Sequence, residues 1–115
     1  ALLAALREAG GSPATLDEIF SSCEIEPALG RRAMASLEKA GEAMRVTKEL
    51  AFAAEALAQF EQAVRTRLAD GASASAAELR DAMGTTRKYA IPLLEYFDDK
   101  GITRRSGDER VLTGR

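Results

Sequence analysis

The sequence predicts a mainly α-helical fold with small β-hairpins, built as two copies of one unit in tandem. Each half of the 115-residue chain contains three segments with the hydrophobic spacing of helices. Each half then has a glycine followed by two short segments that alternate around a turn. The halves also align with an offset of sixty residues. The aligned pairs are Ile19 with Leu79, Cys23 with Met83, Leu37 with Phe97 and Gly41 with Gly101.

The first two helices of the first half are short. The apolar positions of the first are Leu2, Leu3, Leu6 and Ala9, and the Gly-Gly-Ser-Pro segment at 10–13 ends it. Thr15 and Glu18 have the spacing of a capping box, in which each side chain accepts a hydrogen bond from the other residue's backbone N–H. A second helix is therefore expected from about residue 16.

A longer helix and a hairpin complete the first half. Pro27 suits the first turn of a helix, and Gly41 suits its end. The predicted apolar stripe of this helix consists of Leu29, Ala33, Leu37 and Ala40. Residues 43–52 alternate around a polar turn at 47–49, which is typical of two short strands.

The second half repeats this order of elements. Helices are expected over 54–69, over 76–83, and from a cap at Thr85 or Thr86 to Lys100. Pro92 falls inside the last helix, where it removes one backbone hydrogen bond, yet the apolar spacing continues past it. Strands are expected over 102–105 and 110–113, joined by the tight turn Ser-Gly-Asp-Glu at 106–109.

Three helices closed by a hairpin are typical of the winged-helix form of the helix-turn-helix. We therefore predict two tandem winged-helix domains, residues 1–53 and 54–115. The alternative is a six-helix bundle with two loose loops. The glycine stop followed by alternating strand residues, which occurs twice, favours the hairpins.

Composition argues against an enzyme. The chain has no histidine, so the commonest general base and metal ligand are missing, and it has no phosphate-binding glycine motif. The acidic pairs Asp98-Asp99 and Asp108-Glu109 are interpreted as solvated surface charge, because neighbours on a helix point apart. A lone cysteine, Cys23, cannot form an internal disulfide and is predicted to be a buried structural thiol.

No segment resembles a membrane span or a secretory leader. The chain does not start with Met, and both ends are interpreted as cuts inside a longer protein. The net charge of −2 does not by itself announce a polyanionic partner. A nucleic-acid contact must therefore come from a local basic patch.

Basic residues gather in the last third of the chain. From residue 84 onward there are seven Lys and Arg against five Asp and Glu, a net of +2, whereas residues 1–53 carry six against eight, a net of −2. Arg87 and Lys88 begin the predicted third helix of the second unit, where backbone N–H groups and the helix dipole favour anions. Arg104, Arg105 and Arg110 flank the wing turn.

These observations predict a small cationic cradle where the wing meets the amino end of that helix. Tyr89 and Tyr96 could stack on bases, but their helical spacing towards the core favours packing. The first unit offers only Arg31 and Arg32 on the matching helix, with Lys48 beside Glu49 at its wing. We therefore interpret it as a spacer or protein-docking module.

The string TRKYAIPLLEYFD at 86–98, continuing to GITRRSGD at 101–108, resembles the last winged-helix domain of the bacterial selenocysteine-specific elongation factor family, SelB. The tandem repeat agrees with that family's C-terminal order of elements. The resemblance implies that this chain binds the selenocysteine insertion (SECIS) stem-loop of mRNA, and that the final domain grips the hairpin loop with its third helix and wing. The matching residues here are Arg87, Lys88, Arg104, Arg105, Ser106, Gly107, Asp108 and Arg110.

The resemblance also implies a cytoplasmic translation factor whose GTP-binding part, absent from this chain, meets the ribosome and selenocysteinyl-tRNA. We expect no cofactor or metal in this fragment, no membrane partner and a monomer. Two other hypotheses remain open. A transcription regulator would insert the third helix into a DNA major groove. A protein-docking module would use the acidic first unit.

Overall fold

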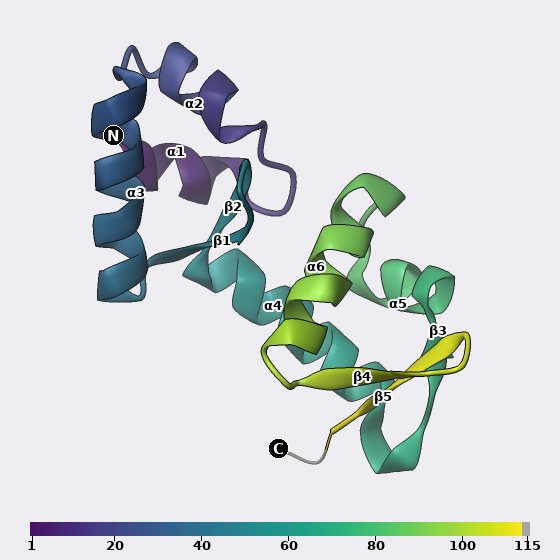
Figure 1. Ribbon diagram of the computed structural model, residues 1–115. Coiled ribbons are helices and arrows are strands. Elements are labelled where there is room, and N and C mark those ends of the chain that lie inside the picture. The colour runs from purple at the N-terminus through teal and green to yellow at the C-terminus, as the bar shows by residue number, and fades with distance from the viewer. Residues whose placement is uncertain (114–115) are drawn as a thin grey trace. The chain divides into compact units, whose positions relative to one another are not determined.

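The computed structural model describes residues 1–113, which form two compact units. The first unit comprises Ala1–Ala58 and the second begins at Gln59. Figure 1 shows that each unit consists of three helices and a hairpin, the winged-helix arrangement. The boundary lies within one helix, α4 (Ala54–Arg67), whereas the sequence analysis placed it between 53 and 54, at the start of the same helix.

The first unit has the predicted order of elements. They are α1 (Leu2–Ala9), α2 (Leu16–Ser22), α3 (Pro27–Ala40), β1 (Ala43–Thr47) and β2 (Leu50–Ala53). The Thr15–Glu18 capping box is confirmed, and so is Pro27 in the first turn of α3. Strands β1 and β2 are antiparallel, with Ala43 opposite Ala53, so the hairpin closes on the start of α4.

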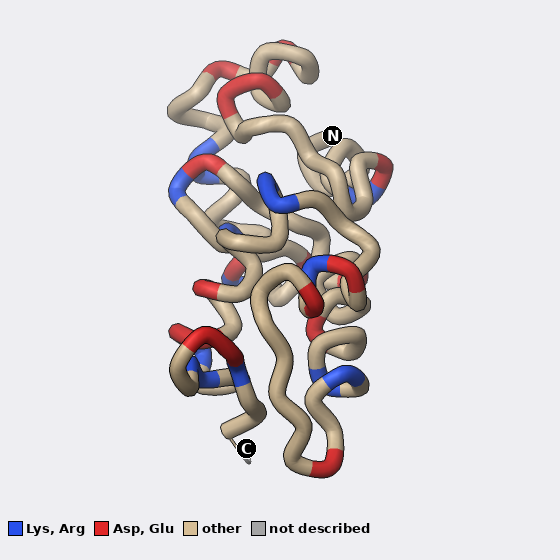
Figure 2. Tube along the Cα trace, turned by 90° about the vertical axis from the view of Figure 1, so that its right-hand side faces the viewer, with Lys and Arg blue, Asp and Glu red and all other residues tan. Residues whose placement is uncertain are grey.

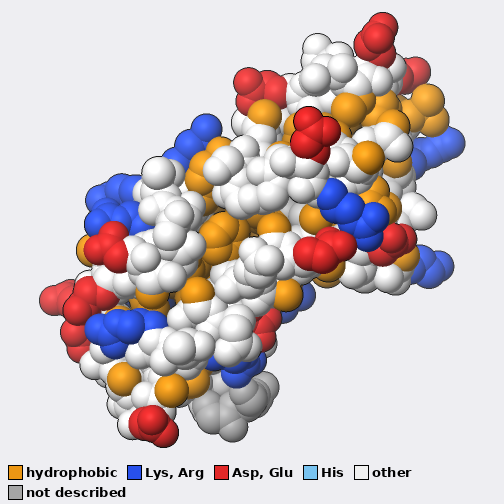
Figure 3. Space-filling view, turned by 180° about the vertical axis from the view of Figure 1, so that it is seen from behind, with side chains coloured by type: hydrophobic (Ala, Val, Ile, Leu, Met, Phe, Trp, Pro, Cys, Tyr) orange, Lys and Arg blue, Asp and Glu red, His pale blue; other side chains and the backbone are white. Residues whose placement is uncertain are grey.

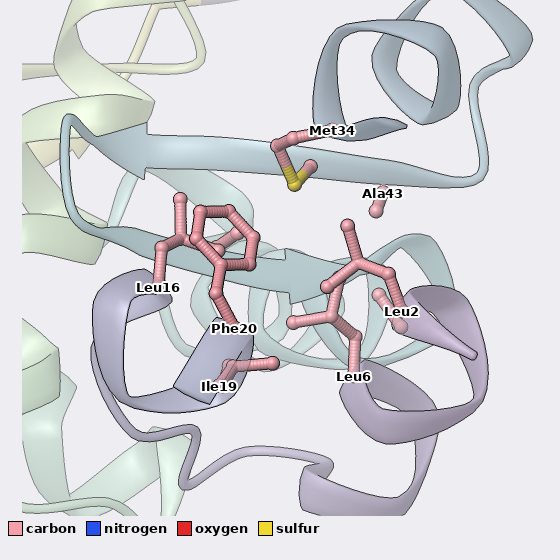
Figure 4. Close-up of a cluster of buried hydrophobic side chains, with 9 residues drawn as sticks. Leu2, Leu6, Leu16, Ile19, Phe20, Met34 and Ala43 are labelled. Carbon is pink, nitrogen blue, oxygen red and sulfur yellow. The ribbon is translucent and has the colours of Figure 1, made fainter. Parts of the chain in front are cut away.

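The core of the first unit is drawn in Figure 4, where side chains of α1, α2, α3 and the hairpin meet. The predicted stripe of α3 was partly wrong, since Leu29 is 53% exposed while Gly30 and Met34 are buried. The cause is Phe20, whose buried ring lies against the Gly30 backbone and turns that side of α3 inward. Cys23, predicted to be buried, is half-buried and packs against this core.

The second unit confirms the predicted helices and adds two short elements. Its elements are the rest of α4, a 3₁₀ turn η1 (Ala69–Gly71), β3 (Ala74–Ser75), α5 (Ala76–Met83), α6 (Arg87–Asp99), β4 (Thr103–Ser106) and β5 (Glu109–Leu112). The helix α6 runs through Pro92, as the spacing predicted. Thr86 is its N-cap residue, although its side chain accepts no capping hydrogen bond.

Strand β3, which the sequence pattern does not predict, makes the wing part of a three-stranded sheet of order β3-β5-β4. Ala74 pairs with Arg110 and Ser75 with Glu109, so β5 is the central strand. Ser75 also forms a capping box with Glu78, sixty residues after Thr15 and Glu18. The core beneath this sheet includes Leu79, Leu94 and Phe97, all fully buried. The two wing strands are therefore part of a three-stranded sheet and do not form an isolated hairpin.

Candidate nucleic-acid interface

The start of α6 presents two exposed cations. Arg87 and Lys88 occupy the first turn, where backbone N–H groups lack helical partners and the helix dipole is positive. Among residues 1–113, no carboxylate lies within ion-pair distance of either side chain. The Lys88 ammonium lies 5.4 Å from the centroid of the Tyr89 ring. This turn can therefore accept an anion without first breaking an internal pair.

A third cation near this turn escaped the sequence analysis. Arg87 shares the lining of a small hollow of about 60 Å³ with Arg80 on α5, and Ile91 forms part of its apolar wall. Arg80 also contacts its neighbour Asp81 at 3.2 Å. The sixty-residue offset could have revealed it, because the offset aligns Arg80 with Phe20, which is buried in the core of the first unit. An arginine at the position of a core residue indicates that the two units differ at this point.

The wing carries the second exposed group of polar residues. After the buried Thr103, the remaining residues of β4 and those of the following turn are exposed: Arg104, Arg105, Ser106, Gly107 and Asp108. Gly107 has φ +64°, a left-handed conformation that suits glycine in a tight turn. Within the described chain, neither arginine is paired with a carboxylate. The wing therefore offers two available guanidinium groups beside a turn with exposed backbone.

Arg110 was wrongly predicted as a surface contact. Its side chain is only 9% exposed and pairs with Asp98, at 3.0 Å from Nη2 to Oδ2. Its Nε also donates to both Asp98 oxygens, at 3.2 and 3.1 Å. Interpreting Asp98 as solvated surface charge was therefore also wrong. Arg110 is buried at a point where Asp98, at the end of α6, supplies a carboxylate.

The predicted meeting of the wing with the amino end of α6 is also wrong. Asp98, in the last turn of α6, accepts hydrogen bonds from Thr103 on β4 and Arg110 on β5. The wing is thus joined to the carboxyl end of the helix, as the path of the chain in Figure 1 shows. The cations at the amino end of α6 and those on the wing, which is anchored at the carboxyl end, therefore form two groups.

The tyrosines differ in their surroundings. Tyr96 is half-buried and packs edge-to-face on Phe97, with ring centroids 5.9 Å apart. The Lys100 ammonium lies 5.5 Å from the Tyr96 ring. Tyr89 is half-buried in the first turn of α6, beside Lys88. Packing accounts for Tyr96, whereas Tyr89 lies next to the candidate contact residues.

In the first unit, carboxylates hold most of the arginines. Arg31 on α3 lies 3.2 Å from both Asp17 and Glu49. Arg45 on β1 lies 2.6 Å from Glu38, and this hydrogen bond raises the pKa of the Arg45 guanidinium. Figure 2 marks both signs of charge along each unit, and Figure 3 shows them interspersed over the visible face. The net charge therefore does not indicate which Lys and Arg side chains are free of carboxylate partners and can bind an anion.

The fold and these exposed positions define a tandem winged-helix module. Residues 66–112 match the family described as "Elongation factor SelB, winged helix". Over these residues the second unit is similar to the winged-helix domain of that family. No helix among residues 1–113 is both long and apolar enough to cross a membrane.

Two curated relatives illustrate this likeness. The selenocysteine-specific elongation factor of Escherichia coli is 36% identical over 67 residues, which cover 58% of this chain and 11% of the relative. That of Haemophilus influenzae is 26% identical over 105 residues, 91% of this chain and 17% of the relative. The chain therefore spans less than a fifth of the length of these relatives.

Two solved structures share the arrangement. The mRNA-binding domain of SelB from E. coli, solved in complex with SECIS RNA, is 26% identical with a TM-score of 0.80, covering 96% of this chain and 95% of that one. The bacterial selenocysteine-specific elongation factor EF-Sec is 29% identical with a TM-score of 0.74, covering 96% of this chain and 17% of that one. The likeness thus extends over both winged-helix units.

Proposed function

We propose that this chain binds the SECIS stem-loop of mRNA. The observation that carries the proposal is the match, over nearly the whole of both chains, to the SelB domain solved with that RNA. The exposed, unpaired cations of the second unit support it, because phosphate contacts need side chains that have no stronger internal partner.

The proposed contacts fall into two groups. Arg87 and Lys88 would receive phosphates at the start of α6. Arg80, which is also paired with Asp81, lines the hollow beside Arg87. The wing residues Arg104, Arg105, Ser106, Gly107 and Asp108 would contact the second part of the RNA, through guanidinium groups and the backbone of the turn. Arg110 is left out because Asp98 holds it inside the unit.

The charge pattern favours a stem-loop over a long duplex. A chain of net charge −2 with two small cationic groups can neutralise only a few phosphates, so non-specific affinity should be modest. Unstacked loop bases add edges and faces that arginine and the wing backbone can bind.

The rest of the proposal concerns the longer factor. In it, this region would bind mRNA in the cytoplasm as a monomer, while other parts bind GTP, selenocysteinyl-tRNA and the ribosome. The first unit would serve as a spacer or docking module. This chain would supply no cofactor site and no catalytic step of its own.

Fluorescence anisotropy tests the proposal. The chain is titrated into a labelled SECIS hairpin and into duplex DNA of the same length, at several salt concentrations. A preference for the hairpin of at least about a hundredfold at physiological salt is expected, which corresponds to about 2.7 kcal/mol. Equal affinity for both would contradict RNA recognition, and a preference for the duplex would favour the DNA-binding alternative.

A further inference from the structure

Asp98 is the centre of a largely buried polar cluster in the second unit. Its Oδ1 accepts a hydrogen bond from the Thr103 hydroxyl at 2.6 Å, and its carboxylate receives three contacts from the Arg110 guanidinium at 3.0–3.2 Å. Thr103 is 1% exposed and Arg110 8%. One side chain in the last turn of α6 therefore binds both strands of the wing hairpin.

The first unit uses the same position differently. Glu38 lies sixty residues before Asp98, and its partner Arg45 lies sixty residues before Arg105. In the first unit the helix-end carboxylate thus holds the arginine of the first wing strand. In the second unit it holds Arg110 on the second strand, and Arg105 stays exposed and unpaired within the described residues.

The register of the wing makes this choice consequential. Arg105 stands directly opposite Arg110 across β4 and β5. Two like charges in opposed positions destabilise a hairpin. Asp98 compensates one of them and leaves the other available, while tying the hairpin to α6.

We propose that Asp98 and Arg110 are positioning residues, which fix the wing on the end of α6 so that Arg104 and Arg105 are held in the orientation that binds RNA. This proposal rests on the proposed function, because it gives Asp98 and Arg110 the role of orienting two arginines that are proposed to bind RNA. Arg104 and Arg105 supply the contacts, and the pair restricts where they can be.

A double-mutant cycle tests this role. Arg110→Gln is measured alone and in the Arg104→Ala, Arg105→Ala background, by anisotropy with the SECIS hairpin. We expect a roughly tenfold loss of affinity alone, and about twofold or less once the two wing arginines are gone, because coupled residues are not additive. Arg110→Lys keeps one donor and the charge, and should restore part of the affinity.

The matched control comes from the first unit. Arg45→Gln breaks the equivalent pair with Glu38, so it should lower stability while leaving hairpin affinity unchanged. Near-ultraviolet circular dichroism confirms that each variant is folded. If Arg110→Gln does not fold, the cycle is run with Arg110→Lys.

The outcomes separate this proposal from the proposed function. Equal losses for Arg110→Gln in both backgrounds, or no loss in a folded variant, would overturn the positioning role while hairpin binding stands. If the parent chain shows no preference for the hairpin, the proposed function fails first. Hydrogen exchange of the wing amides then still tests the anchor: faster exchange in Arg110→Gln supports it, and unchanged exchange overturns it.

Discussion

In the first unit one arginine of the third helix and one of the wing are held by carboxylates, whereas in the second unit most cations of the corresponding elements are exposed. Arg31 lies between Asp17 and Glu49, and Arg45 is bound by Glu38. Arg104 and Arg105 have no such partner among the described residues. A duplicated fold can therefore keep its architecture while changing which cations face a ligand, through the placement of a few acidic residues.

The contact between the second and third helices differs in the same way. In the first unit, the ring of Phe20 fills the space against Gly30. The aligned positions in the second unit hold Arg80 and Ala90, which line a small hollow together with Arg87. The contact between the second and third helices is therefore filled by a core side chain in the first unit, whereas in the second unit it contains a small hollow lined by two arginines.

The largest expected difference between the units concerns RNA affinity. Arg104→Ala with Arg105→Ala should weaken hairpin binding by about tenfold to a hundredfold and lower the salt slope by about one to two units, because two phosphate or base contacts are lost. Anisotropy titrations at several salt concentrations measure both quantities.

The matched control removes two exposed cations from the first unit, by Arg32→Ala with Lys48→Ala. It changes the net charge equally, so a general electrostatic attraction would weaken both double variants alike. We expect the control to change affinity by about twofold or less. Equal losses would show that the second unit has no privileged surface.

A smaller difference concerns packing. A Cβ on Gly30 would lie 2.6 Å from two atoms of the buried Phe20 ring, so Gly30→Ala should destabilise the chain. Overpacking costs about 1–3 kcal/mol, and better helix propensity returns about 1 kcal/mol. In the second unit the order is reversed, and Ala90→Gly should be the destabilising change. Urea denaturation measures both, and a more stable Gly30→Ala variant would contradict the packing argument.

Local signals predicted most of the fold from the sequence. Helical spacing, the Thr15–Glu18 box, Pro27 and the two hairpin turns each depend on neighbouring residues, and the structure confirms them. Strand β3 escaped because two residues carry no periodicity of their own. Its pairing with β5 depends on contacts between distant segments, which no local pattern reveals.

The candidate site was less predictable for the same reason. The sequence identified where cations are numerous, and Arg87, Lys88, Arg104 and Arg105 are indeed exposed. It could not tell that Asp98 reaches Arg110, because the pair joins a helix end to a strand twelve residues later. The sequence shows how many charged residues there are, but whether a cation can bind a ligand depends on which carboxylates lie beside it in the folded structure.

The smallest expected effect concerns the stability contributed by the Ser75–Glu78 capping box at the start of α5. The backbone N–H and hydroxyl of Ser75 bind Glu78 and lower the pKa of its carboxyl, and Arg67 at 3.4 Å lowers it further. A pKa lowered by folding stabilises the chain above the unfolded value of about 4.3, and this contribution is lost as pH falls through the folded pKa. Glu78→Gln keeps an acceptor for the backbone but removes the charge. The difference in urea midpoint between parent and variant should therefore be present at pH 7 and should shrink as the pH falls below the unfolded pKa. Glu95→Gln, at an exposed position of α6, controls for the loss of one negative charge. A difference in urea midpoint that persists in acid would contradict the assignment to Glu78.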